Sequence, residues 1–195
     1  MKGPDAISLA RANAWFQGRG LVAERMPAGR IPGKRAPDFQ VYSSRGELFF
    51  CEVKALSLRM DPETNCFKHT TTLRKLADHV VTAAEQFGSV NKTHMVPNVL
   101  FWNSDHFQLN FSSLIMMLRG YLGVEGREFA DFKRLRSIQK ARANLATIDL
   151  HIWLQGESTQ LVYIPTFTEP FRARLLIRML SLESVPITNA QSFGL

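Results

Sequence analysis

Residues 35–54 read RAPDFQVYSSRGELFFCEVK, and this stretch predicts a two-stranded antiparallel hairpin. Residues 38–42 alternate polar and apolar side chains, whereas residues 48–55 are aromatic and apolar until Glu52 and Lys54 interrupt them. The intervening Ser-Ser-Arg-Gly is typical of a turn. We therefore expect two strands whose ionisable residues gather at one end.

The register of this hairpin decides which side chains share a face. Because side chains alternate along a strand, Glu52 and Lys54 are expected to point to the same face of the sheet. If Asp38 lies opposite Glu52, the loop between the strands has five residues, which is an acceptable length. The same register pairs Tyr42 with Leu48. It brings the two carboxylates and the lysine together.

Two ionisable groups at the end of an apolar strand indicate a site, because an isolated buried charge is costly or shifts its pKa until it is neutral. Asp38 and Glu52 would supply the hard oxygen ligands that Mg²⁺ prefers, with Mn²⁺ as a substitute. Lys54 would orient or deprotonate a water molecule, or neutralise charge that builds on a phosphate. We therefore predict metal-assisted hydrolysis of phosphodiesters. The structural alternative is a surface hairpin whose charges discourage aggregation at an exposed edge.

The arrangement of Pro37-Asp38 and Glu52-Val53-Lys54, with thirteen residues between the two, resembles the PD-(D/E)XK nuclease superfamily. Together with residues 25–27 and the glycine-rich basic loop that follows them, it looks most like the archaeal Holliday junction resolvases. The resemblance covers about residues 5–103. It implies a restriction-endonuclease-like fold with the element order αβββαβ. It also implies Asp38 and Glu52 as metal ligands, the Val53 carbonyl as a further ligand, and Lys54 as the catalytic lysine.

The predicted first helix, residues 5–17, departs from this resemblance. Many superfamily members carry an acidic residue there that faces the metal, but Asp5 is the only acid of this helix. Asp5 follows Pro4, so its role as a helix N-cap is favoured over a role as a metal ligand. Gln86, late in a helix predicted at residues 73–87, resembles the helix glutamine of some nuclease branches. The number of metal ions therefore stays open.

Length and composition predict a single domain. The 195 residues divide into a core at about 5–103, an elaboration at about 104–183 and a tail at 184–195, and 45% hydrophobic residues suffice for a packed core. The net charge of +7 suits DNA, although basic surfaces also serve membranes and solubility. Two cysteines argue against a disulfide framework or a zinc site. No apolar stretch approaches the length of a membrane span, so we expect a cytoplasmic protein.

Two groups of cations are candidate contacts for nucleic acid. Arg30, Lys34 and Arg35 precede Asp38 in a loop rich in Gly and Pro, where they would either meet phosphates at the rim of the site or form a solvated loop. The second group lies on a basic helix predicted at residues 127–142, and its cations are either phosphate contacts or the solvated face of that helix. This second group comprises Lys133, Arg134, Arg136 and Lys140.

The remaining patterns predict an α/β protein with a central mixed sheet flanked by helices. Besides the hairpin, the first half should contain helices at 5–17 and 73–87 and strands at 21–26 and 96–102. The second half should be mostly helical over 104–145, including an apolar helix at 111–122, followed by strands at 146–154 and 159–164 and a helix at 171–182.

The sequence thus predicts a Mg²⁺-dependent DNA endonuclease, with RNA as an alternative substrate. A two-fold dimer is compatible with cutting both strands of a duplex. Two other classes stay open: a nucleic-acid-binding or assembly module that keeps the fold without catalysis, and a subunit that binds a partner through the apolar helix at 111–122. The form of the substrate stays open too, because phosphate contacts carry no sequence information.

Overall fold

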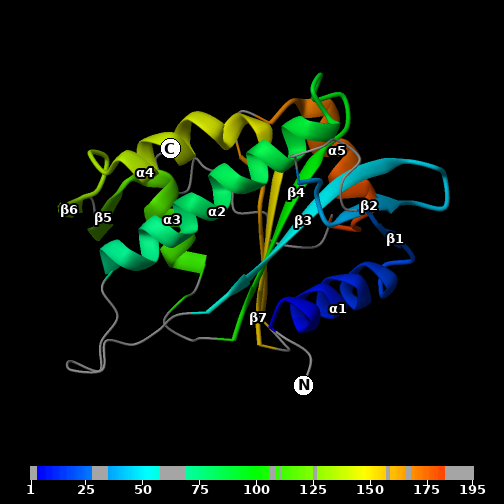
Figure 1. The fold of residues 1–195 in the computed structure, drawn as a ribbon, viewed down its shortest axis with the longest axis horizontal. Helices are drawn as coiled ribbons and strands as arrows, with labels where there is room; N and C mark the ends of the chain where they lie inside the picture. Colours follow the sequence, from blue (N-terminus) through cyan, green and yellow to red (C-terminus); the bar gives the residue numbers. More distant parts are fainter. Residues whose placement is uncertain are drawn as a thin grey trace.

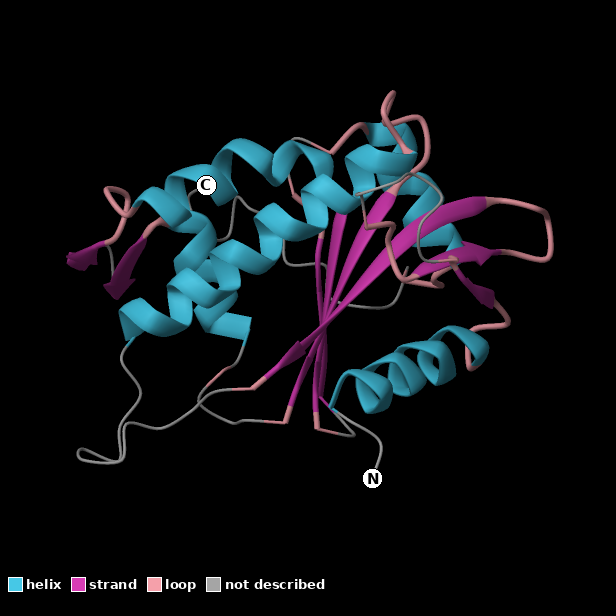
Figure 2. Cartoon of the chain, viewed as in Figure 1, coloured by secondary structure: helices cyan, strands magenta, loops and turns pink. Residues whose placement is uncertain are grey.

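A six-stranded mixed sheet with helices on both faces forms the centre of the protein (Figures 1 and 2). The structure is a computed structural model that describes residues 4–27, 35–57, 69–105, 109, 111–124, 127–156, 159–165 and 168–182. The helices are α1 (Pro4–Gln17), α2 (His69–Val90), α3 (Phe111–Arg119), α4 (Arg136–Asn144) and α5 (Pro170–Met179), with a short 3₁₀ turn, η1 (Leu145–Thr147). The strands are β1 (Val22–Arg25), β2 (Phe39–Tyr42), β3 (Leu48–Leu56), β4 (Asn98–Ser104), β5 (Tyr121–Val124), β6 (Arg127–Asp131), β7 (Leu150–Gln155) and β8 (Thr159–Tyr163).

The sheet order β1-β2-β3-β4-β7-β8 confirms the predicted α/β class. Strands β1, β2 and β3 are antiparallel, β3, β4 and β7 run parallel, and β8 returns antiparallel to β7. In the β2–β3 hairpin, Phe39 lies opposite Cys51 and Tyr42 lies opposite Leu48, which is the predicted register. Asp38 lies one residue before β2, at the place where this register puts it opposite Glu52.

The two faces of the sheet carry separate cores. On one face, α1 and α5 bury residues such as Phe16 and Leu176 against Phe49 and Phe101 of the sheet. On the other face, α2, α3 and α4 pack against Trp102 and its neighbours. The apolar helix α3 belongs to this second core, since its buried side chains include Leu114 and Met117. From the sequence, this helix could be part of the core or a dimer surface. Its buried side chains show that it is part of the core.

The prediction of one basic helix over residues 127–142 is wrong in its first part. Residues 127–131 form β6, which pairs with β5, and α4 begins only at Arg136. Gly120 ends α3 with φ +78°, a conformation that side-chain-bearing residues rarely adopt. The chain then turns into β5, and antiparallel pairing with β5 holds residues 127–131 as a strand. The predicted tail at 184–195 lies outside the described residues.

The unequal lengths of β2 and β3 create the feature on which the site is built. The pairing with β2 stops at Phe39, opposite Cys51, whereas β3 continues to Leu56. The last part of β3 therefore has β4 on one side and no strand of the described chain on the other. This part of β3 lies between α1 on one face of the sheet and α2 on the opposite face (Figure 1).

No helix among the described residues is long and apolar enough to cross a bilayer.

Candidate active site at the free edge of β3

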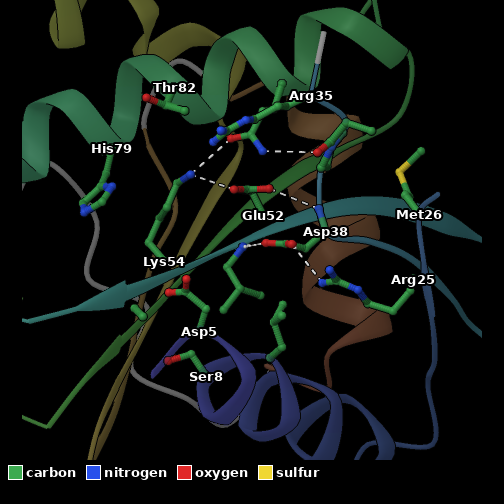
Figure 3. Close-up of a pocket in the computed structure, with 16 residues that line it drawn as sticks. Asp5, Ser8, Arg25, Met26, Arg35, Asp38, Glu52, Lys54, His79 and Thr82 are labelled. Carbon is green, nitrogen blue, oxygen red and sulfur yellow. Dashed lines mark hydrogen bonds and ion pairs between the residues drawn. The ribbon is translucent and has the colours of Figure 1, made fainter. Parts of the chain in front are cut away.

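A pocket of about 700 Å³ lies along the free edge of β3 (Figure 3). It brings together residues from parts of the chain that are far apart in sequence. Its polar lining comes from the start of α1 (Asp5, Ser8), the end of β1 (Arg25), the segment before β2 (Arg35, Asp38), the edge of β3 (Glu52, Lys54) and one face of α2 (His79, Thr82, Gln86).

Asp38 and Glu52 are held by reciprocal hydrogen bonds between side chain and backbone. The backbone N–H of Asp38 donates to Glu52 Oε2 at 3.1 Å, and the N–H of Val53 donates to Asp38 Oδ2 at 2.9 Å. The carboxylate of Asp38 thus accepts the bond that a strand carbonyl would otherwise accept. Continuing the hairpin register places Pro37 opposite Val53, and proline has no N–H to donate to the Val53 carbonyl. The Pro-Asp pair therefore ends the strand ladder and leaves oxygen atoms at its end.

Both carboxylates have cationic partners. Arg25 Nη1 lies 2.9 Å from Asp38 Oδ1, and Lys54 Nζ lies 2.6 Å from Glu52 Oε1. Lys54 also donates to Gln86 Oε1 at 3.1 Å, and Gln86 Nε2 donates to the carbonyl of Ala36 at 3.2 Å. This chain of bonds fixes the ammonium group of Lys54 between β3 and α2.

The carboxyl of Glu52 holds its proton more tightly than an ordinary glutamate does. Glu52 is 4% exposed, and burial raises its pKa from an ordinary 4.5 to about 7, with the negative charge of Asp38 adding to the rise. The Lys54 ammonium and the Gln86 side chain lower this pKa by smaller amounts. Two carboxylates that repel each other in a buried position form a place where added positive charge is favourable.

The donor set fits a small hard cation. Asp38, Glu52 and the Val53 carbonyl all offer oxygen, and Mg²⁺ commonly takes one or two carboxylates and completes its shell with water and substrate phosphate. Among the residues that the structure describes, no three His, Cys, Asp or Glu side chains meet as a metal-binding cluster. Asp5, one residue inside α1 rather than before it, lines the same pocket without completing such a cluster.

If the pocket holds Mg²⁺, the pKa of Glu52 would make the binding of that ion depend on pH. The folded pKa of Glu52 lies above its unfolded value, so in the absence of metal this carboxyl disfavours the folded state increasingly as pH rises from about 4.5 to about 7. Mg²⁺ needs the ionised form, so we expect its apparent Kd to be about tenfold weaker at pH 6 than at pH 8. Calorimetric titration at the two pH values measures this difference.

A matched variant shows whether the effect belongs to this carboxyl. In the same titration, Glu52→Gln should bind Mg²⁺ more weakly than the parent protein and with the same Kd at pH 6 and pH 8. Equal Mg²⁺ affinities at pH 6 and pH 8 in the unsubstituted protein would contradict the assignment.

The structure separates the two predicted groups of cations. Arg35 lines the pocket, whereas Arg30 and Lys34 lie outside the described residues. The second group is exposed but divided: two of its cations stand in the turn before α4 and two lie on the helix, and none of the four lines the pocket. These four residues are Lys133, Arg134, Arg136 and Lys140.

Sequence reasoning missed several residues of the pocket. Arg25 was not predicted as a site residue. It lies in β1, opposite Phe39 of β2, and from there its side chain reaches Asp38, the residue before Phe39. His79 was also missed, and its signal is the helical spacing from Gln86, since residues seven apart lie on one face of a helix. Gln86 was predicted as a site residue only by analogy with the nuclease family. Its hydrogen bond from Lys54 shows that it holds the lysine ammonium in place.

Comparisons with known proteins assign no family. No family model matches the chain, and no curated protein matches it. Among solved structures, it is similar to the structure of Pyrococcus furiosus SfsA in complex with Ca²⁺, with a TM-score of 0.31 and 10% identity, over 81% of this chain and 62% of that one. The matched part is thus less than two thirds of SfsA. A likeness this weak carries no argument, so the function is argued from the pocket alone.

Proposed function

We propose that this protein is a Mg²⁺-dependent DNA endonuclease with a restriction-endonuclease-like core. One observation carries the proposal: Asp38, Glu52 and Lys54 meet at the free end of a strand ladder that Pro37 terminates. The order α1-β1-β2-β3-α2-β4 supports it, because this is the order that the resemblance implies. The net charge of +7 supports a polyanionic substrate.

In this mechanism the chain's own residues bind and orient the reactants. Asp38, Glu52 and the Val53 carbonyl would hold the cation, which when bound polarises the phosphate and lowers the pKa of water. The ammonium of Lys54 would orient the attacking water and offset negative charge that develops on the phosphate. Gln86 keeps that ammonium in place, so it acts as a positioning residue through Lys54.

Cations around the pocket would hold the nucleic-acid backbone. Arg25 and Arg35 line the pocket and would contact phosphates next to the one that is cleaved. Lys133, Arg134, Arg136 and Lys140 would contribute charge outside it. Arg30 and Lys34, which lie outside the described residues, are proposed as further phosphate contacts. Such contacts make binding depend on salt without reading the base sequence.

Incubation of the protein with supercoiled plasmid, linear duplex, single-stranded DNA and a four-way junction tests the proposal. Each substrate is compared in Mg²⁺, Mn²⁺ and EDTA, and we expect cleavage in both metals and none in EDTA. The substrate that is cut fastest defines the class on which the enzyme acts. Absence of cleavage on every substrate in both metals would reject the proposal.

A second candidate is a nucleic-acid-binding subunit that keeps this fold without catalysis. The ion pairs of the pocket favour it, because Arg25 and Lys54 already neutralise the two carboxylates and no third acid joins them among the described residues. This candidate predicts salt-sensitive DNA binding in both Mg²⁺ and EDTA, with no cleavage in either.

A further inference from the structure

In each of the two paired carboxylates of the pocket, the backbone holds one oxygen and a cation holds the other (Figure 3). Asp38 Oδ2 accepts from the N–H of Val53, and Glu52 Oε2 accepts from the N–H of Asp38. Asp38 Oδ1 accepts from Arg25 at 2.9 Å. Glu52 Oε1 accepts from Lys54 at 2.6 Å. The oxygens that remain for a metal ion are therefore the two that already have a cationic partner.

These two cations differ in how firmly they are held. The Lys54 side chain is 11% exposed and donates to Gln86 as well as to its carboxylate partner, so it is fixed between β3 and α2. The Arg25 side chain is 54% exposed, and within the described chain its guanidinium has one hydrogen bond, to Asp38. The guanidinium carbon also lies 5.1 Å from the centroid of the Phe39 ring. Arg25 is therefore the cation that can leave its partner.

The bond to Asp38 uses only part of what the guanidinium offers. A guanidinium carries five N–H donors in a planar fork, which suits two oxygens of one carboxylate or phosphate. Because the backbone takes Asp38 Oδ2, Arg25 holds this carboxylate at one oxygen only. The oxygens of a phosphate would accept both arms of the fork.

The surrounding charges and backbone allow the guanidinium to move. A divalent cation at Asp38 would repel it, because positive charges a few Å apart interact unfavourably. The N–H of Met26 donates to the Asp38 carbonyl at 3.1 Å, which anchors the end of β1, so only the side chain of Arg25 has to move. Asp5, the third carboxylate of the pocket, forms no ion pair with Arg25 in the described part of the chain and does not hold the guanidinium back.

We propose that Arg25 couples metal binding to substrate binding by exchanging partners. In the free protein its guanidinium occupies Asp38 Oδ1, and once a metal ion binds there the guanidinium turns to a phosphate of the bound nucleic acid. The inference rests on the proposed function for the identity of both ligands. Because linkage is reciprocal, each ligand then strengthens the binding of the other by the same factor. The contrasting role is a fixed partner of Asp38 that shares its oxygen with the metal.

Titration with Mg²⁺ in the absence of DNA measures the competition. Arg25→Gln removes the competing charge, so calorimetry should give a Mg²⁺ Kd about three- to tenfold lower than that of the parent protein. Arg45→Gln makes the same change in the exposed turn between β2 and β3 and should leave the Kd unchanged. Both variants should melt close to the parent temperature, because exposed ion pairs contribute little to stability.

DNA binding with and without metal measures the exchange itself. The probes are a short labelled duplex and a four-way junction, each titrated in EDTA and in Ca²⁺, which takes the same oxygen ligands; a gel verifies that the DNA stays intact. The factor by which Ca²⁺ strengthens DNA binding should be about fivefold larger for the parent than for Arg25→Gln. Arg25→Lys keeps the charge and should retain part of this factor. In nitrogen NMR spectra, the guanidinium signal of Arg25 should shift when Mg²⁺ is added and shift again when DNA follows.

The outcomes separate this inference from the proposed function. If the parent protein cuts DNA but Arg25→Gln changes neither the Mg²⁺ Kd nor the Ca²⁺ factor, Arg25 is a fixed partner and the nuclease assignment stands. If no substrate is cut but Arg25→Gln shows the lower Kd and the smaller factor, the exchange stands and catalysis is rejected. A lower Kd with an undiminished factor reduces Arg25 to a competitor of the metal and overturns the exchange. Absence of Mg²⁺ binding in both proteins rejects both.

Discussion

Replacing Asp38 with Asn or Lys54 with Ala is expected to reduce Mg²⁺-dependent cleavage about 100- to 1,000-fold, the usual cost of removing one charge-stabilising group from an active site. Asp38→Asn keeps an oxygen for the Val53 N–H but loses the negative charge needed for the cation. Lys54→Ala removes the ammonium that lies 2.6 Å from Glu52 and 3.1 Å from Gln86. The measurement is the initial rate of cleavage on the preferred substrate at saturating Mg²⁺.

Two matched variants away from the pocket separate this effect from a general loss of charge. Asp78→Asn and Lys92→Ala make the same chemical changes at exposed positions and should cut at the parent rate. DNA affinity should stay within a few-fold in all four variants, because catalysis and not binding is disabled. If Asp38→Asn or Lys54→Ala cuts as fast as the controls, the carboxylates and the lysine are structural, and the second candidate function is favoured.

The hairpin could be predicted from sequence because the information lies within twenty neighbouring residues. Alternation in residues 38–42 and a turn at Gly46 fix both strands, and a one-residue slip would have moved every apolar side chain to the wrong face. The order α1-β1-β2-β3-α2-β4 follows from the same local patterns. The coming together of Asp38, Glu52 and Lys54 could be predicted for the same reason.

The remainder of the pocket depends on contacts between distant segments. Gln86 is thirty-two residues beyond Lys54, and no local pattern shows that its amide reaches the ammonium group. Arg25 reaches Asp38 because β1 adds to the sheet beside β2, which is a tertiary fact. The strand β6 was missed because the cations that follow it suggested one continuous basic helix, whereas pairing with β5 decides its structure.

The second large effect is expected on stability, at a buried polar cluster around Asp149, the residue just before β7. Asp149 is 1% exposed and accepts from Arg172 Nε at 2.8 Å and from the backbone N–H of Asn98 at 2.9 Å, while His94 Nε2 lies 2.7 Å from its Oδ2. Asp149→Ala would leave Arg172 and the Asn98 N–H without their acceptor in a place with little access to water. We expect the free energy of unfolding to fall by about 3–5 kcal/mol, measured by urea denaturation.

An exposed ion pair provides the control for this loss. Arg11 pairs with Asp105, whose side chain is 67% exposed, so Asp105→Ala should change the free energy of unfolding by less than about 1 kcal/mol. Asp149→Asn keeps the size of the side chain and one acceptor oxygen, so its loss in free energy of unfolding should fall between those of Asp149→Ala and Asp105→Ala. This loss can still be measured if Asp149→Ala does not fold. Equal losses for Asp149→Ala and Asp105→Ala would mean that the buried cluster adds no more than a surface pair.

The same variants distinguish stability from chemistry. Asp149 joins the start of β4 to the loop at His94 and to α5, and none of these contacts belongs to the pocket at the free edge of β3. Asp149→Asn should therefore lower the folded fraction at elevated temperature while each folded molecule cuts at the parent rate. Lys54→Ala should do the reverse, because it removes the ammonium group that we propose orients the attacking water, in a sheet that stays folded.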